Sequence, residues 1–211
     1  MKAVLDYSVL YNDDDILVLN KRSGLLIAAD RYDESAQRLD LIAEKEFGKL
    51  FAVHRLDKDT SGAIIYAKNA ESHRFLSKQF EERKVEKIYH CLVNGHPLWE
   101  TLHVDAKLLP DGDARHRTIP NQRFGKPAIT DFKMLGACGP YSWIEARPHT
   151  GRTHQLRLAA ADSHGFGKPI VGDTLYGTCA PGERLMLHAQ SLRFTHPVTG
   201  EPMEFTSEPD F

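Results

Sequence analysis

Cysteine is scarce in this chain of 211 residues, and long apolar runs are absent. The three cysteines, Cys91, Cys138 and Cys179, are odd in number and more than 40 residues apart, which excludes a disulfide framework and paired zinc ligands and predicts packing roles. The longest apolar run, Ala63–Ala67, has five residues, whereas a membrane-spanning helix needs about 18 or more. We therefore expect no membrane association.

The first residues also lack targeting features. Met1–Asp6 forms neither an apolar signal core nor a basic, acid-poor transit segment, so a cytoplasmic location is expected. With 41% hydrophobic and 27% charged residues, the composition is that of an ordinary globular chain. It has room for one sizeable core or two closely packed lobes.

A strong excess of positive charge is also missing, because the formal net charge is −2. This excludes binding to nucleic acid through bulk charge alone. The basic residues nevertheless concentrate in the middle of the chain, with five against one acid in 115–133 and four against one acid in 147–168. Such segments permit a local phosphate-binding face, and the alternative is an ordinary solvated surface.

The hydrophobic pattern switches repeatedly between strand and helix periodicity. It predicts helices at 35–47, from an Asn69 N-cap through 83, and at 151–161. It predicts strands at 15–20 in a hairpin with 25–27, and at 62–68, 87–94, 101–106, 128–136, 141–147, 185–193 and 203–206. This order indicates an α+β fold with a mixed, mostly antiparallel sheet and flanking helices. No segment is typical of a linker, so we expect one domain, 1–211, whose two halves meet at a central cleft.

The segment His54–Gly62 has the highest density of reactive side chains. Five of its nine residues are ionisable, and it lies between two apolar runs. A charged loop between buried strands suits a rigidly held carboxylate, with Thr60 and Ser61 as hydrogen-bonding residues and Gly62 in a tight turn. The alternative is a purely structural polar turn.

A second polar cluster occupies His149–Arg157. If Thr150 or Thr153 capped the following helix, backbone N–H groups and Arg152 would form an anion site at its N-terminus. The alternative is a capped helix with a solvated cationic face. The two histidines lack a third clustered ligand, so no metal site is expected.

Together with other segments of the chain, these two clusters resemble the RluA-type pseudouridine synthases, enzymes that isomerise uridine within RNA. The resemblance rests on ordered blocks: Tyr11–Lys21 with Ser23–Leu25, His54–Asp57 with Thr60–Gly62, Lys87–Tyr89 with Val93–Gly95, Thr150–Arg157, and the C-terminal pairs Gly172–Asp173, Tyr176–Gly177, Leu187–Ala189 and His196–Pro197. These blocks span nearly the whole chain. Two departures occur: Arg22 stands where the family usually has proline, and Leu158–Ala159 replaces the usual Val-His.

The resemblance implies an active site. Asp57 would be the catalytic carboxylate, Arg157 its paired cation, and Tyr89 the aromatic that stacks on uracil. Arg55 would occupy the space left by the flipped base, and Leu187 would supply an apolar wall. Our candidates for phosphate contacts are Arg115, Arg117, Arg123, Lys126 and Arg152.

The resemblance further implies a cofactor-free and metal-free monomer acting on structured RNA, such as a ribosomal or transfer RNA stem-loop, and not on DNA. About ten residues precede the first block, too few for the S4 RNA-binding module that relatives often carry. Two alternatives stay open. One is a non-catalytic RNA-binding or RNA-remodelling protein on the same fold, and the other is a hydrolase that uses Asp57 with Asp59.

Overall fold

The computed structural model of the chain describes residues 6–28, 37–163, 165–180 and 182–211. Backbone contacts group the chain into two compact units. Unit 1 comprises Met1–Lys87 and Ala189–Asp210, and unit 2 comprises Ile88–His188 together with Phe211. Unit 1 is therefore built from two segments that are far apart in sequence.

Unit 1 is a sheet with two helices. Its strands are β1 (Tyr7–Asn12), β2 (Ile16–Lys21), β3 (Phe51–Ala52), β4 (Ser61–Ala67), β10 (Leu187–Thr195, from Ala189 onward) and β11 (Pro202–Thr206), and its helices are α1 (Leu39–Phe47) and α2 (Ala70–Glu81). The strand order is β1-β2-β4-β10, with β3 on β4 and β11 on β10. The pairs β1·β2, β2·β4, β3·β4 and β10·β11 are antiparallel.

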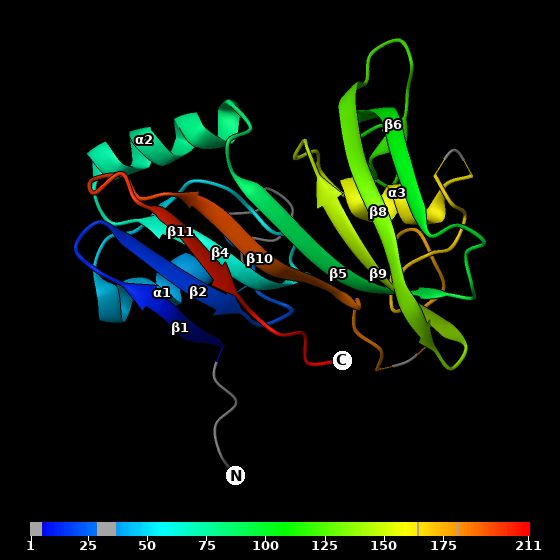
Figure 1. Ribbon diagram of the computed structural model, residues 1–211, viewed down its shortest axis with the longest axis horizontal. Coiled ribbons are helices and arrows are strands. Elements are labelled where there is room, and N and C mark those ends of the chain that lie inside the picture. Colours follow the sequence, from blue (N-terminus) through cyan, green and yellow to red (C-terminus); the bar gives the residue numbers. More distant parts are fainter. Residues whose placement is uncertain (1–5, 29–36, 164, 181) are drawn as a thin grey trace. The chain divides into compact units, whose positions relative to one another are not determined.

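The core of unit 1 follows from continuous aliphatic runs in its central strands. All seven residues of β4 are buried, as expected for a strand covered on both faces. Leu76 of α2 packs with Ile65 and Leu192 from two strands, and α2 lies along the sheet in Figure 1. Asn69 caps this helix by accepting a hydrogen bond from the backbone N–H of Ser72, as predicted.

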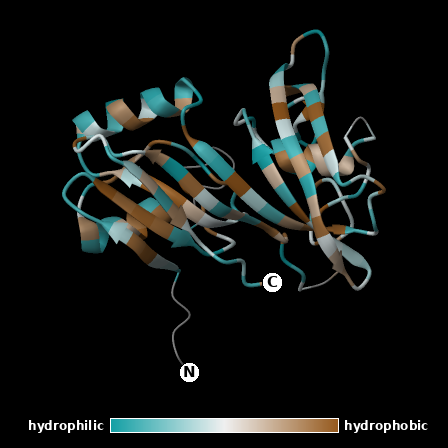
Figure 2. Cartoon of the chain, viewed as in Figure 1, coloured by the Kyte–Doolittle hydropathy of each residue, from teal (hydrophilic) through white to brown (hydrophobic). Residues whose placement is uncertain are grey.

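Unit 2 is a second antiparallel array with one short helix. Its elements are β5 (Glu86–Asn94, from Ile88 onward), β6 (Thr101–Leu109), β7 (Ile119–Pro120), β8 (Lys126–Cys138), β9 (Tyr141–Pro148) and α3 (Gln155–Ala161). The strand order is β5-β9-β8-β6-β7. Hydrophobic and hydrophilic residues alternate along β6 and β8 (Figure 2), because one face of each strand covers the core.

The predicted fold class is confirmed. Three α-helices lie beside mostly antiparallel strands in the part of the chain that the structure describes, and the isolated bridge between Leu26 and Arg38 is parallel. None of these helices is both long and apolar enough to cross a membrane.

The predicted hairpin of residues 15–20 with 25–27 is wrong. β2 pairs instead with β1 on one side and with β4 on the other. The turn before β2 is closed by Asp13, whose Oδ1 accepts the backbone N–H groups of Asp15 and Ile16. A side-chain-closed turn upstream therefore determines the hairpin partner of β2. The prediction left out β1, whose three exposed and three half-buried residues do not alternate regularly.

Two helices begin later than predicted. α1 starts at Leu39, because Leu26 exchanges backbone hydrogen bonds with Gln37 and Leu39 and holds that segment extended. The first predicted residues, 35 and 36, lie outside the described residues. α3 starts at Gln155 rather than near 151, after His154 in the left-handed conformation.

The cysteines also differ from expectation. Cys91 is a packing residue in the core of unit 2, whereas Cys138 is exposed and Cys179 is half-buried. Burial raises the pKa of Cys91 to about 12, so its thiol stays protonated at neutral pH.

Gly62 is required by a close approach of two strands rather than by the tight turn that the sequence suggested. It lies in β4 with φ +111°, and a Cβ atom there would stand 2.3 Å from the carbonyl oxygen of Ala189. Any side chain would force the paired backbones apart.

We predict that Gly62→Ala lowers the free energy of unfolding by about 2–5 kcal/mol, through positive-φ strain and overpacking. Urea denaturation measures this loss. Gly136→Ala is the matched control, since no atom lies within 4 Å of its Cβ position, and it should change stability by less than about 1 kcal/mol. Equal stabilities of the two variants would contradict the assignment.

Candidate active site

The candidate nucleophile Asp57 lies in the loop between β3 and β4 of unit 1 and is half-buried. Its own carbonyl oxygen accepts the backbone N–H of Thr60, which closes a tight turn. Leu56 and Thr60, on either side of the turn, are buried. The carboxylate is therefore presented by a loop whose flanks are fixed in the core.

The buried ammonium group of Lys21 ties this loop to β2. Its Nζ donates hydrogen bonds to the carbonyl oxygens of Arg22, Leu25 and Lys58, at 3.0, 2.9 and 2.8 Å. Burial lowers the pKa of Lys21 to about 7, while the carboxylates of Asp59 and Asp57 act in the opposite direction. One side chain thus connects the residue after Asp57 to the end of β2.

Two further bonds hold the same loop to the segment after β2. The backbone N–H of Gly24 donates to the carbonyl oxygen of Lys58, and Ser23 Oγ donates to the carbonyl oxygen of Asp59. This places the block Ser23–Leu25 beside the Asp57 loop in space. The sequence alone showed only that both segments match the family.

His54 fixes the other end of the loop. Its Nε2 accepts the backbone N–H of Ile65, and its ring stacks on Phe80 of α2 with centroids 4.6 Å apart. Burial lowers the pKa of His54 to about 3, with Lys87 contributing in the same direction. The imidazole is therefore neutral at pH 7 and serves as a structural acceptor.

We predict that Lys21→Met lowers the free energy of unfolding by about 2–4 kcal/mol, because three carbonyl oxygens lose a shared donor. Urea denaturation provides the measurement. Lys45→Met, an exposed substitution on α1, is the control and should remain within about 0.5 kcal/mol of the original protein. If Lys21→Met is as stable as this control, the ammonium does not hold the loop.

Unit 2 contributes Arg157, which is 3% exposed on α3. Its Nε and Nη2 donate to the two carboxylate oxygens of Asp173, both at 2.8 Å. Although burial opposes ionisation, hydrogen bonds from Arg157 and its positive charge hold the pKa of Asp173 below its usual value. The guanidinium is thereby fixed in one orientation.

Tyr176 packs on the same guanidinium. The centre of the Arg157 guanidinium lies 5.6 Å from the ring centroid, within cation–π range. The Tyr176 hydroxyl donates to the carbonyl oxygen of Thr118 and accepts the backbone N–H of the same residue. His154 Nδ1 lies 3.0 Å from that hydroxyl, so His154 and Arg157 both contact Tyr176.

Neither Thr150 nor Thr153 caps α3, so that prediction is wrong. The residue before the helix is His154, which makes no capping hydrogen bond. Thr150 Oγ1 instead donates to Gln155 Oε1 and accepts the backbone N–H of Ile129. Gln155 Oε1 also accepts the backbone N–H of Arg152, so this N–H group is not available as the anion donor that we expected.

Tyr89 and Leu187 lie together in one hydrophobic cluster of unit 2. Leu187 is 3% exposed, and half-buried Tyr89 packs against the same cluster, which also contains Leu156, the neighbour of Arg157 on α3. Two of the four residues assigned to the pocket, Tyr89 and Leu187, thus belong to one packed region, and Arg157 lies in the same unit. Asp57 belongs to unit 1.

The proposed phosphate contacts differ in how firmly they are held. Arg117 is engaged, because its Nε donates to Asp113 and its Nη1 donates to the carbonyl oxygen of Leu175. Arg55, Arg115, Arg123 and Lys126 are exposed, and half-buried Arg152 donates to the carbonyl oxygen of Pro127. Arg117 is therefore better suited to supporting the loop than to binding a mobile ligand.

Sequence reasoning missed the roles of Lys21, Asp173 and Tyr176. All three lie in blocks that carry the family resemblance, which was the available signal. Their importance depends on partners far along the chain: Lys21 bonds to Lys58, and Tyr176 to Thr118. Hydrophobic periodicity contains no information about such contacts.

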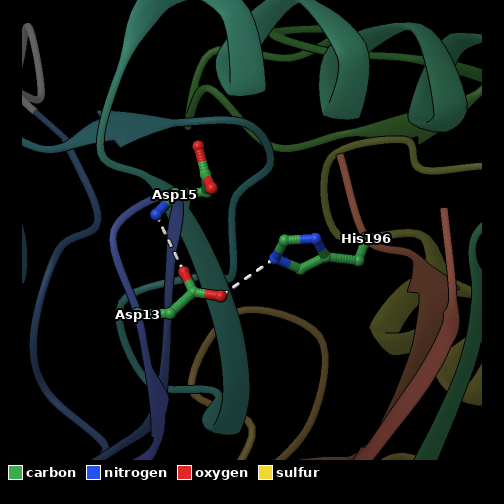
Figure 3. Close-up of side chains that lie close together, drawn as sticks. All are labelled: Asp13, Asp15 and His196. Atoms are coloured by element: carbon green, nitrogen blue, oxygen red, sulfur yellow. Dashed lines mark hydrogen bonds and ion pairs between the residues drawn. The ribbon is translucent and has the colours of Figure 1, made fainter. Parts of the chain in front are cut away.

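Among the described residues, one group has metal-ligand spacing: Asp13, Asp15 and His196 in unit 1 (Figure 3). His196 Nδ1 accepts the backbone N–H groups of Val198 and Thr199, so its Nε2 carries the proton donated to Asp13 Oδ2 at 2.9 Å. Both ring nitrogens are therefore used in this arrangement. The group is a hydrogen-bonded clamp between the β1–β2 turn and the β10–β11 turn.

The same clamp reaches α2. Asp15 Oδ1 accepts from Asn69 Nδ2 and from Ser72 Oγ, at 2.8 and 3.1 Å. His149 and His154, the other histidines considered as metal ligands, contact different residues. His149 Nε2 lies 2.5 Å from Asp131 Oδ2, whereas His154 contacts Tyr176. These two histidines therefore have different hydrogen-bond partners.

We predict that Asp13→Asn destabilises unit 1 in a pH-dependent way. Burial of Asp13 opposes ionisation, but backbone N–H groups and His196 hold its pKa below the usual value. The ionised group therefore contributes stability above about pH 4, and the contribution disappears as pH falls through the lower folded pKa. Urea denaturation should show a loss of about 1 kcal/mol at pH 7 that shrinks toward pH 3. A pH-independent difference would contradict this role.

The chain is similar to several known proteins. Residues 15–162 match the family described as RNA pseudouridylate synthase. A dual-specificity RNA pseudouridine synthase RluA from Escherichia coli (strain K12) is 37% identical over 207 residues, covering 96% of this chain and 93% of that protein. The protein of the same name from Haemophilus influenzae is 36% identical over 211 residues, with the same coverage.

The chain is also similar to solved structures. Human RNA Pseudouridylate Synthase Domain Containing 1 has a TM-score of 0.79 at 30% identity, covering 97% of this chain and 84% of that chain. Human RNA Pseudouridylate Synthase Domain Containing 4 shares the fold, with a TM-score of 0.76 at 22% identity.

Proposed function

This chain belongs to the RNA pseudouridylate synthase family, and we propose that it isomerises specific uridines in structured RNA, such as ribosomal or transfer RNA stem-loops, with Asp57 as nucleophile. The observation that supports this most is the held carboxylate: Asp57 lies at a turn whose next residues are bonded to Lys21, Ser23 and Gly24. The segment His54–Gly62, which contains that turn, is also one of the blocks that carry the family resemblance.

The reaction needs one ionised carboxylate. The glycosidic bond between C1′ and N1 breaks, the uracil turns, and C1′ joins C5, so no atom is gained or lost. Asp57 can act by attacking the sugar, by attacking the base or by removing a sugar proton, and each route begins from the ionised form. A rigid loop suits every route, because effective catalysis depends on a small set of approach geometries.

The other pocket residues have complementary roles in this proposal. Tyr89 stacks on the uracil, and Leu187 forms an apolar wall that excludes water until the base re-attaches. Arg157 stabilises the ionised carboxylate of Asp57. The buried carboxylate of Asp173 accepts two hydrogen bonds from Arg157 and so fixes the plane of the guanidinium.

RNA binding in the proposal is electrostatic and shape-dependent. The target uridine must leave its stack, which costs a few kcal/mol unless it is already unstacked in a loop. Arg55 occupies the vacated space, and the phosphate contacts come from Arg115, Arg117, Arg123, Lys126 and Arg152. The protein acts as a cytoplasmic monomer of one catalytic domain, without metal or cofactor.

We predict that Asp57→Ala abolishes pseudouridine formation, with a loss of about 10³-fold or more, because no other group supplies the nucleophile. Purified protein would be incubated with transcribed ribosomal and transfer RNA, and pseudouridine would be mapped. Asp59→Asn is the control and should retain activity, since a two-carboxylate hydrolase mechanism would need both acids. Undiminished activity of Asp57→Ala would refute the assignment, and RNA binding without any modification by the original protein would favour a non-catalytic role.

A further inference from the structure

An exposed phenylalanine projects from the turn between β7 and β8 of unit 2. Phe124 is 65% exposed, whereas Phe132, a few residues further along β8, is 2% exposed. The hydrophobic effect favours burial of an aromatic ring, so the exposed position of Phe124 is unusual. The turn connects two strands that lie on either side of β6 in the sheet, since β6 pairs with both β7 and β8.

The turn is held in place by hydrogen bonds, so the exposure of Phe124 is built into the backbone. Asn121 Oδ1 accepts the backbone N–H groups of Arg123 and Phe124, at 3.0 and 2.9 Å. The N–H of Gly125 donates to the carbonyl oxygen of Asn121, and the N–H of Asn121 donates to the carbonyl oxygen of Lys107. A Cβ at Gly125 would lie 2.3 Å from the Asn121 oxygen, so the turn is also tightly packed.

A guanidinium lies against the exposed ring. The central carbon of the Arg123 guanidinium is 4.9 Å from the Phe124 ring centroid, within cation–π range. The pair is exposed and adjacent in sequence, so it forms a small platform with one aromatic and one cationic surface.

Further cations surround this platform. Lys126 begins β8, and Lys107 lies opposite Pro127 in the β6·β8 register. Arg152 reaches the same point, because its Nε donates to the carbonyl oxygen of Pro127. The stretch 120–128 contains no Asp or Glu. The surface is thus cationic around a single flat apolar ring.

We propose that Phe124, with Arg123 against it, stacks on an unpaired base of the RNA substrate, while Lys107, Lys126 and Arg152 bind the flanking phosphates. The inference rests on the proposed function for its substrate class and adds a base contact remote in sequence from Asp57. A rigid aromatic beside cations matches the chemistry of single-stranded nucleic acid, where stacking is combined with phosphate neutralisation.

A protein partner is the less fitting occupant of this surface. Protein docking sites need a contiguous apolar patch, whereas Phe124 is the only large apolar side chain among residues 121–126, which read Asn, Gln, Arg, Phe, Gly and Lys. One flat ring matches one nucleobase in area. The shape of the surface therefore selects an unpaired nucleotide.

The test is a binding titration of the full chain with a transcribed stem-loop that the protein modifies. Phe124→Ala should weaken RNA binding about 5- to 100-fold, the usual range for loss of one base–aromatic stack. Phe124→Trp should retain binding, whereas Phe124→Leu, which keeps apolar bulk without a π face, should behave like the alanine variant. Unfolding midpoints should be unchanged, because the side chain is exposed.

A fluorescent base reports the contact directly. 2-Aminopurine, placed in turn at each unpaired position of the loop, should be quenched on binding at one position, and the quenching should be absent in Phe124→Ala. Val198→Ala is the matched control, because Val198 is also 65% exposed but lies on the β10–β11 turn, which lacks nearby Lys or Arg in sequence. It should bind RNA as the original protein does.

The outcomes separate the two proposals. If the original protein forms no pseudouridine in any RNA, the proposed function fails. If it does form pseudouridine while Phe124→Ala matches it in affinity and KM, the stacking contact is refuted and the function stands. If Phe124→Leu binds as well as Phe124→Trp, the ring does not stack and the inference is also overturned. Support consists of a raised KM with unchanged kcat for Phe124→Ala.

Discussion

The position of the loop that carries Asp57 depends on one buried ammonium group. Lys21 ends β2, is 1% exposed, and directs its three N–H donors to carbonyl oxygens from the segment after β2 and from the Asp57 loop. A buried charge is costly unless its hydrogen bonds are satisfied. The chain therefore cannot displace this loop without leaving the ammonium group short of acceptors. The need to satisfy this buried ammonium group therefore fixes the position of the Asp57 carboxylate, although its segment has no regular secondary structure.

In unit 2 a buried group of opposite charge, the carboxylate of Asp173, holds Arg157 in place. Asp173 is fully buried and accepts both donors of the Arg157 fork as well as the backbone N–H groups of Leu175 and Tyr176. Four hydrogen bonds on one carboxylate define the position of the guanidinium and of the loop that follows β9 and α3. Tyr176 then links this loop to Thr118 on the far side of the arm formed by β6 and β7. Each unit thus holds its catalytic candidate with a satisfied buried ion.

Much of the architecture could be predicted from the sequence. β4, β5, β8, β9, β11 and α2 follow from periodicity and from the Asn69 cap, since these are local signals. The failures come from hydrogen bonds that hydrophobic periodicity does not report. Side-chain bonds of Asp13 and Gln155 to nearby backbone N–H groups shape the turn before β2 and the start of α3, and Leu26 bonds to the more distant Gln37 and Leu39 before α1. The residue types of the site came from the family resemblance, while the roles of Lys21 and Asp173 emerged from three-dimensional contacts.

The division of the chain has a consequence for biosynthesis. Unit 2 is one nearly continuous stretch, Ile88–His188, whereas unit 1 takes Ala189–Asp210 as well as the N-terminal segment. Leu192 and Phe194 of β10 complete the cluster that contains Ile16, Ile65 and Leu76. During translation the amino-terminal strands leave the ribosome long before these residues exist, so the part of this cluster that Leu192 and Phe194 cover stays incomplete while the middle of the chain folds. Unit 1 thus begins first along the chain, but its core can close only after all of unit 2 has been synthesised.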